Sequence, residues 1–526
     1  MCFSVFAVIG RKRKIGILGM STLNKNIAAN YVSQLYVTLI GILILPLYVK
    51  FMGAEAYGLI GFFTMLQSWF MLLDMGLTPT ISRETARYKA GALEPIYFLR
   101  LFRALSVIFL FVAFVGAGGL LLSSNEIAGY WLNVNNLSAN EVGSSLKIIA
   151  VLVALRWCGG LYRGVITGAE QFFWLSIFNI CIATLRFVAV FISMSFYGYS
   201  IEVFFYHQLA VAVLEVSGLF YACSKVLPKA KSFPEAVGWS FKPVKNILKF
   251  SLSIAFTASV WVMVTQTDKM VLSGILPLDE YGYFSMAVLM ASGIMVISGP
   301  ISNALMPRLA KLNASSKYEE MIDLYRKYTR MVAGVAGVVV IVFASCADQI
   351  VYVWTGNAEY SDSVAPVLRL YSLGNGFLVL SAFSYYLQYA KGNLRYHLIG
   401  NGVLLVFLIP LVVVASIKYG GIGAGYVWLG LNLVFFVCWV GYIHKKIVPG
   451  LHMTWLTDDI GKTLMPSIVL GFFIFYVESY MSLENRVTSL FFLMGASLML
   501  MVSMLATFKD IRSKLVVVLQ RIGRCS

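Results

Sequence analysis

Apolar residues in this chain occur in long continuous runs, not in the alternating pattern of half-buried strands. A helix needs about 20 apolar residues to cross a bilayer, whereas strands of an outer-membrane barrel alternate in segments of about ten residues. The pattern therefore predicts an all-α polytopic membrane protein with about 14 transmembrane helices. The predicted helices are 30–50, 57–78, 104–122, 145–167, 171–196, 203–224, 248–275, 281–305, 331–353, 367–389, 397–416, 422–443, 464–481 and 488–507.

A near repeat divides the predicted helices into two sets. The stretch GAEAYGLIGFF at 53–63 returns as LDEYGYFSMAV at 278–288, so the two Tyr-Gly pairs lie 224 residues apart. At the same offset, the turn at 168–172 matches the turn at 392–396. An even number of helices separates the copies, so both keep one orientation in the membrane. This predicts two parallel six-helix repeats, related by an axis along the membrane normal, and two additional C-terminal helices.

The repeat and the polar linkers together predict the organisation of the chain. Residues 1–19 are apolar and then basic, the reverse of a secretory signal, and we expect them to be an extension upstream of a natural start at Met20. The predicted parts are a cytoplasmic N-terminal segment 1–29, a first half 30–225, a linker 226–247, a second half 248–445, a linker 446–463, two further helices 464–508 and a basic tail 509–526.

Composition agrees with the membrane class. Of the 526 residues, 59% are hydrophobic and 12% are charged, against about a quarter charged in an average soluble domain. The net charge of +17 does not point to nucleic acid, because an excess of Lys and Arg in a membrane protein marks cytoplasmic loops. The seven cysteines are scattered, and no Cys/His spacing is typical of a metal site, so we predict none.

The distribution of basic residues predicts the orientation. With the N-terminus inside, 32 of the 41 Lys and Arg residues fall in inside loops, and only Lys50, Lys418 and Arg486 fall outside. We therefore expect both termini to be cytoplasmic. The longest predicted outside loop, 123–144, contains Glu126 and Glu141 but no Lys or Arg, which agrees with this orientation. A loop of this size leaves no room for an inserted catalytic domain.

Several local motifs, taken in order, resemble the polysaccharide transporter family. They are Asn30-Tyr31 with Pro46-Leu47-Tyr48, the stretch 53–63, Leu73-Asp74-Met75-Gly76-Leu77 with Arg83-Glu84, and Thr267-Asp268-Lys269 with Glu280-Tyr281-Gly282-Tyr283. The resemblance covers roughly 24–445 and is to the Wzx-type O-antigen flippases, within the superfamily of multidrug, oligosaccharidyl-lipid and polysaccharide exporters.

This resemblance implies a function without catalysis. Such a protein moves an undecaprenyl-diphosphate-linked oligosaccharide from the cytoplasmic to the periplasmic leaflet of the bacterial inner membrane. The resemblance implies membrane lipid as a partner, together with a polysaccharide polymerase and a chain-length regulator. No ATP-binding or hydrolase motif occurs, so we expect no cofactor beyond coupling to H⁺ or Na⁺. The alternatives are a lipid II flippase and a multidrug or cation antiporter of the same superfamily.

Arginines inside the predicted helices are the first candidates for binding such a substrate. A diphosphate must cross about 30 Å of hydrocarbon, which requires a hydrated cavity with fixed cations. Arg156 and Arg163 lie seven residues apart, on one face of a helix, and Arg186 lies inside the next helix. An arginine there is costly unless it faces a cavity or a partner. We expect all three to contact the diphosphate; an ion pair between Arg186 and Glu215 is the structural alternative.

Other charged residues extend the candidate site. Lys269 and Arg369 complete the predicted diphosphate-binding set. Arg369 and His207 are predicted near the outer surface, where we expect them to meet the sugar or the diphosphate after the flip. The predicted ion-coupling residues are Asp268, Glu215 and Asp74.

Each predicted ion-coupling acid also has a structural interpretation. Asp268 and Lys269 point about 100° apart on a helix, so we do not expect them to pair with each other. Glu215 is either the partner of Arg186 or a proton site, and Asp74 either couples an ion or holds the turn before Arg83. We expect the working residues to surround one central cavity between two halves that rock against each other.

Overall fold

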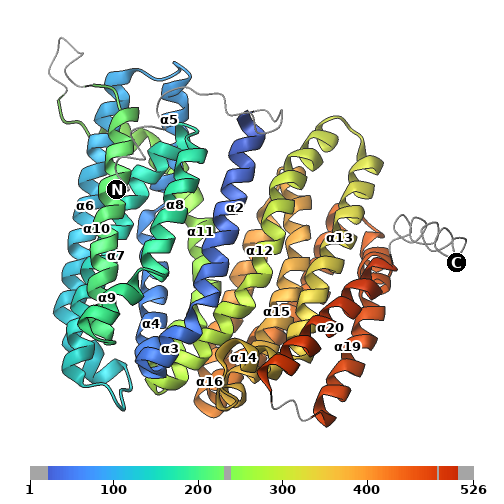
Figure 1. Cartoon of the computed structure of the whole chain (residues 1–526). Coiled ribbons are helices and arrows are strands. Elements are labelled where there is room, and N and C mark those ends of the chain that lie inside the picture. Colours follow the sequence, from blue (N-terminus) through green and yellow to red (C-terminus); the bar gives the residue numbers. More distant parts are fainter. Residues whose placement is uncertain (1–21, 230–237, 482–484, 508–526) are drawn as a thin grey trace, which may run out of the picture.

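Nearly all of the structure is helical. The computed structural model describes residues 22–229, 238–481 and 485–507, and Figure 1 shows long helices packed side by side. Within these ranges the strand-like contact is one isolated bridge between Asn133 and Pro277. The predicted all-α class is confirmed. The predicted extension 1–19 and the basic tail 509–526 lie outside the described residues.

The first half contains α2 (Thr22–Leu43), α3 (Leu45–Met52), α4 (Ala54–Phe70), η1 (Met71–Asp74), α5 (Leu77–Lys89), α6 (Pro95–Glu126), η2 (Ile127–Trp131), α7 (Ala139–Gly168), α8 (Phe172–Phe187), α9 (Val190–Tyr197) and α10 (Ile201–Val226). The second half and the added helices contain α11 (Lys242–Ile275), α12 (Leu278–Ala314), α13 (Tyr318–Ser345), α14 (Ala347–Thr355), α15 (Glu359–Ala390), α16 (Arg395–Val434), η4 (Phe435–Trp439), α17 (Val440–Ile447), α18 (Leu451–Thr454), η5 (Trp455–Gly461), α19 (Lys462–Tyr480) and α20 (Arg486–Leu505).

Twelve helical segments in the described ranges are long and apolar enough to cross a membrane. One of them, Arg395–Ile447, has 53 residues, about 80 Å at 1.5 Å per residue and too long for one crossing. It turns at Gly420, whose φ of 56° and ψ of −140° are not helical. Trp439 Nε1 donates to Tyr396 O at 3.2 Å, so this segment folds back as two antiparallel helices. The predicted count of fourteen crossings stays a prediction.

Several helices extend beyond the apolar runs that predict them. Helix α6 begins at Pro95, well before the predicted start at 104, because residues such as Arg100 lower the hydropathy without weakening the helix. The predicted outside loop 123–144 is shorter in the structure. Helix α6 continues into η2, and Ser138 and Glu141 form a capping box that starts α7.

The two copies of the repeat meet at a close helix crossing. A Cβ on Gly58 of α4 would lie 1.9 Å from Leu278 O, and a Cβ on Gly282 of α12 would lie 2.5 Å from Ala54 O. Leu278 and Gly282 lie 224 residues after Ala54 and Gly58, so these are equivalent contacts seen from the two halves. Such reciprocity is what two parallel repeats around a common axis require.

A loop of the first half strengthens this end of the molecule. The carboxylate of Glu55, only 5% exposed, accepts the three backbone N–H groups of 135–137 at 2.6 to 2.9 Å. In the same loop, Asn133 O accepts Leu278 N at 2.9 Å. The two halves are therefore hydrogen-bonded together at the end that the charge pattern predicts to face outward.

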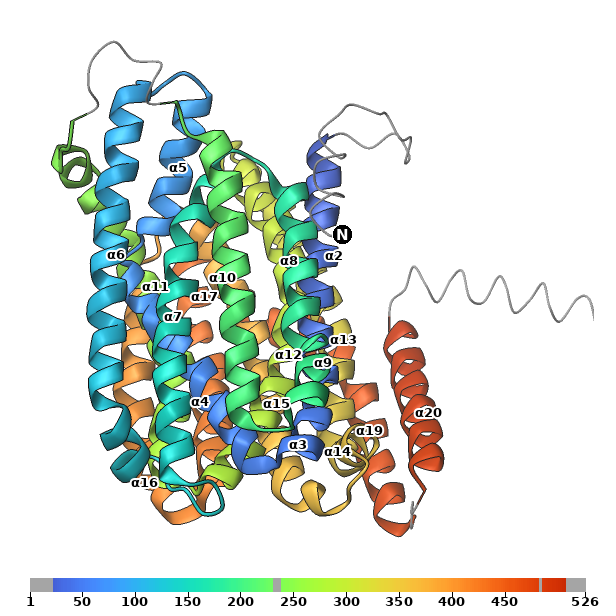
Figure 2. The same ribbon diagram turned by 60° about the vertical axis from the view of Figure 1, so that its left-hand side comes forward.

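The last two helices pack on the second half (Figure 2). A Cβ on Gly337 of α13 would lie 2.2 Å from the Leu464 side chain of α19. Asp459 of η5 is fully buried and accepts Arg326 Nε at 2.7 Å, with Arg330 Nε 3.6 Å away. The predicted additional helices are thus attached by apolar packing and by the ion pairs of one buried carboxylate.

Candidate functional site

Three helices of the first half bring the predicted arginines together. Arg156 and Arg163 extend from α7, Arg186 from α8, and Glu215 from α10. Both oxygens of Glu215 are engaged, Oε1 by Arg163 and Oε2 by Arg186. The ion pair expected as the structural alternative for Arg186 is therefore present, and it includes a second arginine. We call Arg156, Arg163, Arg186 and Glu215 the arginine cluster.

Neutral amides accept hydrogen bonds from two of the three guanidinium groups. Arg156 donates to Gln67 Oε1 at 3.1 Å and to Gln208 Oε1 at 2.8 Å. Arg163 donates to Asn179 Oδ1 at 2.7 Å. These amides were not predicted, although each interrupts an apolar run in the sequence and could have been noticed there.

A cavity of about 520 Å³ opens beside the arginine cluster. Arg163, Arg186 and Glu215 line one side of it. The opposite side is formed by α2, which Figure 1 shows between α8 and α12. Helix α2 contributes polar side chains at Asn30, Ser33, Gln34 and Thr38, whose spacing of three to four residues is that of one helix face. We call this space the arginine cavity. It is polar on both sides, although the helices around it are apolar.

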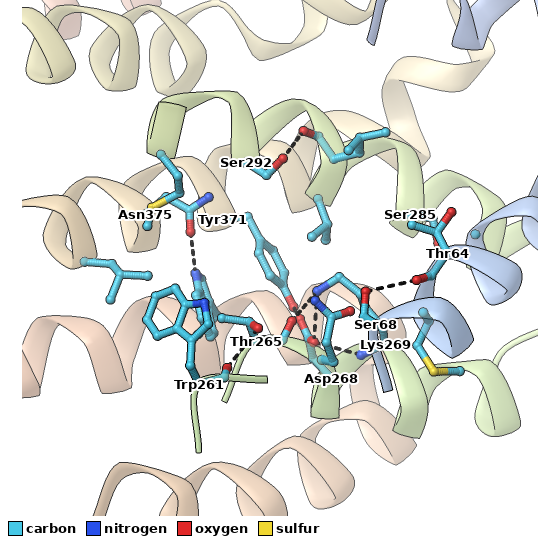
Figure 3. A pocket seen from close by; sticks show the side chains of 18 of the residues that line it. Thr64, Ser68, Trp261, Thr265, Asp268, Lys269, Ser285, Ser292, Tyr371 and Asn375 are labelled. Carbon is cyan, nitrogen blue, oxygen red and sulfur yellow. Dashed lines mark hydrogen bonds and ion pairs between the residues drawn. The ribbon is translucent and has the colours of Figure 1, made fainter. Parts of the chain in front are cut away.

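A second cavity, of about 240 Å³, lies between the two halves. Figure 3 shows its lining side chains, which extend from α4, α11, α12 and α15. Asp268 and Lys269 lie here, with hydroxyl groups such as Thr64 and Ser68 and the ring of Trp261. None of its lining residues also lines the arginine cavity. The predicted working residues therefore do not all line one cavity: Arg163 and Arg186 line the arginine cavity, Asp268 lines the second cavity, and Arg156 lines neither.

Asp268 is held by three donors although it is only 2% exposed. Tyr371 OH donates to Oδ2 at 2.5 Å, and Lys269 contacts Oδ1 through its backbone N at 2.8 Å and its Nζ at 3.2 Å. The prediction that Asp268 and Lys269 do not pair is wrong. The long lysine side chain curves back along the helix, where Nζ also donates to Thr265 O at 2.7 Å.

Tyr371 belongs to an aromatic and amide network that sequence reasoning missed. Its ring stacks on Trp428 with centroids 5.8 Å apart. Trp428 Nε1 donates to Asn375 Oδ1 at 3.0 Å, and Asn375 donates to Ala291 O at 2.9 Å. Because α12, α15 and α16 all take part, this network fixes Asp268 of α11 relative to the other helices of the second half.

Asp74 has a structural contact. It ends η1, after which Met75 and Gly76 adopt positive φ values of 47° and 69°. Its carboxylate accepts Thr78 N at 3.1 Å and Thr78 Oγ1 at 2.6 Å, which satisfies groups at the start of α5. The predicted helix 57–78 is broken here. Asp74 lines neither cavity, so the structure supports the turn-holding interpretation.

Arg369 and His207 lie apart from both cavities. Arg369 pairs with Asp348 and lies over the ring of Phe475, 5.4 Å from its centroid, at the contact with α19. His207 shares hydrogen bonds with Ser193 Oγ at 2.8 Å and Leu185 O at 2.9 Å. The structure therefore does not join either residue to the other candidates.

Comparison with known sequences connects this arrangement to a family. Residues 23–313, more than half of the chain, match the model of a family described as "Polysaccharide biosynthesis protein". A relative from Shigella flexneri, named "Putative O-antigen transporter", is 22% identical over 416 residues, which cover 77% of this chain and 93% of the relative.

Solved structures share the fold. One is the lipid II flippase MurJ in an inward closed conformation, with a TM-score of 0.68, 14% identity, and coverage of 90% of this chain and 97% of that one. Another is an inward-facing multidrug resistance MATE family transporter of the MOP superfamily, with a TM-score of 0.62, 14% identity, and coverage of 79% and 94%. At such identities the likeness concerns the fold alone, and it agrees with the predicted helical bundle of two repeats.

Proposed function

This chain belongs to the polysaccharide biosynthesis protein family, and from that premise we propose that it flips an undecaprenyl-diphosphate-linked oligosaccharide between membrane leaflets. Family and fold make the chain a multi-pass membrane transporter and not an enzyme. The proposed direction is from the cytoplasmic to the periplasmic leaflet of the bacterial inner membrane, with both termini cytoplasmic.

The arginine cavity is the observation that carries this proposal. Arg163 and Arg186 line it and share the carboxylate of Glu215. Arg156 is linked to them through Gln208, whose Oε1 accepts from Arg156 and whose Nε2 donates to Arg186 O. An arginine inside a membrane bundle is stable only with a partner or in a hydrated space, and guanidinium groups match phosphate oxygens in geometry. A diphosphate fits this surplus of positive charge, while a polyprenyl tail can remain in lipid.

We further propose alternating access for the movement. The halves are joined at the predicted outer end by the Gly58 and Gly282 crossing, so opening to the outside requires these helices to separate. Asp268 between the halves is the proposed site for a coupling H⁺ or Na⁺, because an acid inside a transporter bundle is typical of ion coupling. Lys269 lines this second cavity and is a proposed contact for the substrate there. Arg369 lines neither cavity and is not part of the proposed site.

A lipid II flippase is the second candidate function. The specific observation that favours it is the fold of the lipid II flippase MurJ, which covers 90% of this chain. The two functions share the lipid-linked diphosphate and differ in the sugar. Surface polysaccharide and cell-wall synthesis, measured in the same depleted cells, therefore distinguish them.

Replacement of Arg186 tests the proposed function. In a strain that lacks the native gene, we expect Arg186→Ala to reduce surface polysaccharide by about tenfold or more at matched protein level, because a charge-assisted hydrogen bond to phosphate is lost. Arg186→Lys should restore part of the activity, since lysine keeps the charge but not the planar fork. Arg395→Ala, at the exposed start of α16, is the control. Unchanged polysaccharide in Arg186→Ala would remove this residue from the mechanism.

A further inference from the structure

Glu215 holds an unusual position for an acid inside a membrane bundle. It is in the middle of α10, only 4% exposed, and its two oxygens are shared between arginines of α7 and α8. Here a single carboxylate serves two guanidinium groups, and both of these line the arginine cavity.

The charge of the arginine cluster is not balanced. The cluster contains three guanidinium groups and one carboxylate. Glu215 pairs with Arg163 and Arg186, and Arg156 is held by neutral amides. The cluster therefore has two positive charges in excess. A diphosphate esterified on both phosphorus atoms carries one ionised oxygen on each, which are two negative charges. The empty cluster and this substrate class thus sum to neutrality, whereas without Glu215 a bound diphosphate would leave one cation unbalanced.

The cluster also has donors that no acceptor satisfies. Among the described residues, the Nε groups of Arg156 and Arg186 are buried and have no hydrogen-bond partner. A guanidinium has five N–H donors, so an anion can begin to bind Arg186 while Glu215 still holds its Nη2. A phosphate that binds Arg163 and Arg186 in a bidentate manner needs the Nη2 donors that Glu215 now accepts from.

A transporter must release its cargo as well as bind it, so each binding step has to be favourable but weak. If the diphosphate left three bare arginines behind, their burial without a partner would oppose release. We infer that Glu215 is an internal counter-anion, which competes with the substrate diphosphate for Arg163 and Arg186 and restores their pairing when the substrate leaves. This inference rests on the proposed function and assigns Glu215 a role in turnover, not in proton coupling.

The test separates affinity from turnover. The probe is UDP-glucose, a soluble compound whose diphosphate is esterified on both phosphorus atoms, titrated into the purified full-length protein in nanodiscs. Glu215→Gln keeps the size of the side chain and one hydrogen-bond-accepting oxygen but removes the charge. We expect it to bind UDP-glucose at least about tenfold more tightly, because a like charge beside the anion is removed. In cells the same variant should make less surface polysaccharide, since release becomes slow.

Two further variants complete the experiment. Glu215→Asp keeps the charge and should remain within a few-fold of the wild type in both measurements. Glu202→Gln, on the same helix but near its N-terminus, is the matched control and should change neither. A residue with only a structural role would give the opposite result in Glu215→Gln: weaker or unchanged UDP-glucose binding together with lost polysaccharide. That outcome would overturn the inference.

Proton release and uptake give an independent check. In weakly buffered solution we expect UDP-glucose binding to take up no proton, because Glu215 is displaced as a carboxylate. Uptake of a proton by the wild type that is absent in Glu215→Gln would show neutralisation instead, and would contradict the inference.

Failure of the proposed function has a different signature. If Arg186→Ala retains full surface polysaccharide and the wild type does not bind UDP-glucose, the arginine cavity does not hold a diphosphate at all. If Arg186→Ala loses both but Glu215→Gln binds no more tightly than the wild type, only the role of Glu215 is wrong.

Discussion

At the scale of single residues, the buried charges of this protein fall into two arrangements. In the arginine cluster, cations exceed the one carboxylate, Glu215. Around Asp268, one carboxylate is fully satisfied by Tyr371 and Lys269. A surplus of positive charge favours an anionic ligand, whereas an enclosed acid with a nearby cation can change its partners when a small ion binds. The two sites are therefore expected to respond to different substitutions.

Replacement of Asp268 is expected to remove ion coupling while substrate binding is retained. In proteoliposomes with an imposed H⁺ or Na⁺ gradient, Asp268→Asn should lose the acceleration of lipid flipping that the gradient gives the wild type, because the exchangeable charge is gone. Binding of UDP-glucose should stay within about twofold, since the arginine cavity has no residue in common with this site.

The control for this experiment is Asp362→Asn, an exposed acid of α15. It should flip lipid as the wild type does, with the gradient still accelerating transport. If Asp268→Asn also kept its response to both gradients, Asp268 would not be the coupling site.

The residues of the candidate site were predictable where they are ionised. Arg156, Arg163, Arg186 and Glu215 are conspicuous in apolar runs because a charge in lipid is so costly. The amides of Gln67, Gln208 and Asn179 were not predicted. A neutral amide is less costly inside a bundle and commonly serves in helix packing, so its presence alone does not indicate a site.

At the scale of the elements, continuous apolar runs predict where helices lie because lipid requires every backbone group to be paired internally. They do not predict where helices end, since α6 and α12 continue into polar sequence outside the hydrocarbon. They also do not predict how helices are rotated about their axes. The separation of the arginine cavity from Asp268 depends on that rotation and on which helices are neighbours, so sequence spacing could not reveal it.

The crossing of α4 and α12 at Gly58 and Gly282 is expected to close the molecule at the end that the charge pattern predicts to face outward. A side chain at position 58 would place Cβ 1.9 Å from the backbone oxygen of Leu278, which cannot be relieved by a rotamer change. We expect Gly58→Val to prevent the halves from closing there. Transport should fall, and a membrane-impermeant maleimide added outside should label Thr64→Cys several times faster in a cysteine-free background.

Gly118 provides a matched control for this measurement. It lies within α6, and a Cβ there would have nothing within 4 Å. Gly118→Val should therefore leave both transport and labelling of Thr64→Cys unchanged. Equal labelling in Gly58→Val and Gly118→Val would show that the crossing does not close the outer end.

At the scale of the whole molecule, the 224-residue repeat predicts both halves and their parallel orientation. The added helices are the predicted helices that lie outside the two repeats. How the added helices attach was not predictable, because Asp459 pairs with Arg326 and Arg330 more than a hundred residues away. This buried acid connects η5 with α13 and so links the added segment to the second half.

Removal of this link is expected to loosen the added helices. Asp459→Ala removes the charge-assisted hydrogen bond from Arg326 and the nearby contact with Arg330, both of which are partly exposed. We therefore expect a loss of about 2 kcal/mol in unfolding free energy. The measurement is the thermal unfolding of the purified protein in detergent. The neighbouring Asp458, which is 41% exposed and pairs with Lys462 at 2.7 Å, is the matched control. Asp458→Ala should change the transition little, and equal effects of the two variants would contradict the assignment.

The reciprocal contact of Ala54 and Gly58 with Leu278 and Gly282 has a consequence for the origin of the chain. In a dimer of identical subunits, such a contact would be isologous, the same patch meeting itself across a twofold axis. A single six-helix chain with this patch could therefore associate with a second copy of itself in parallel. Fusion of two copies frees each side to change alone, and the sequence shows this: Ser285 faces Gly61, its own equivalent in the first half.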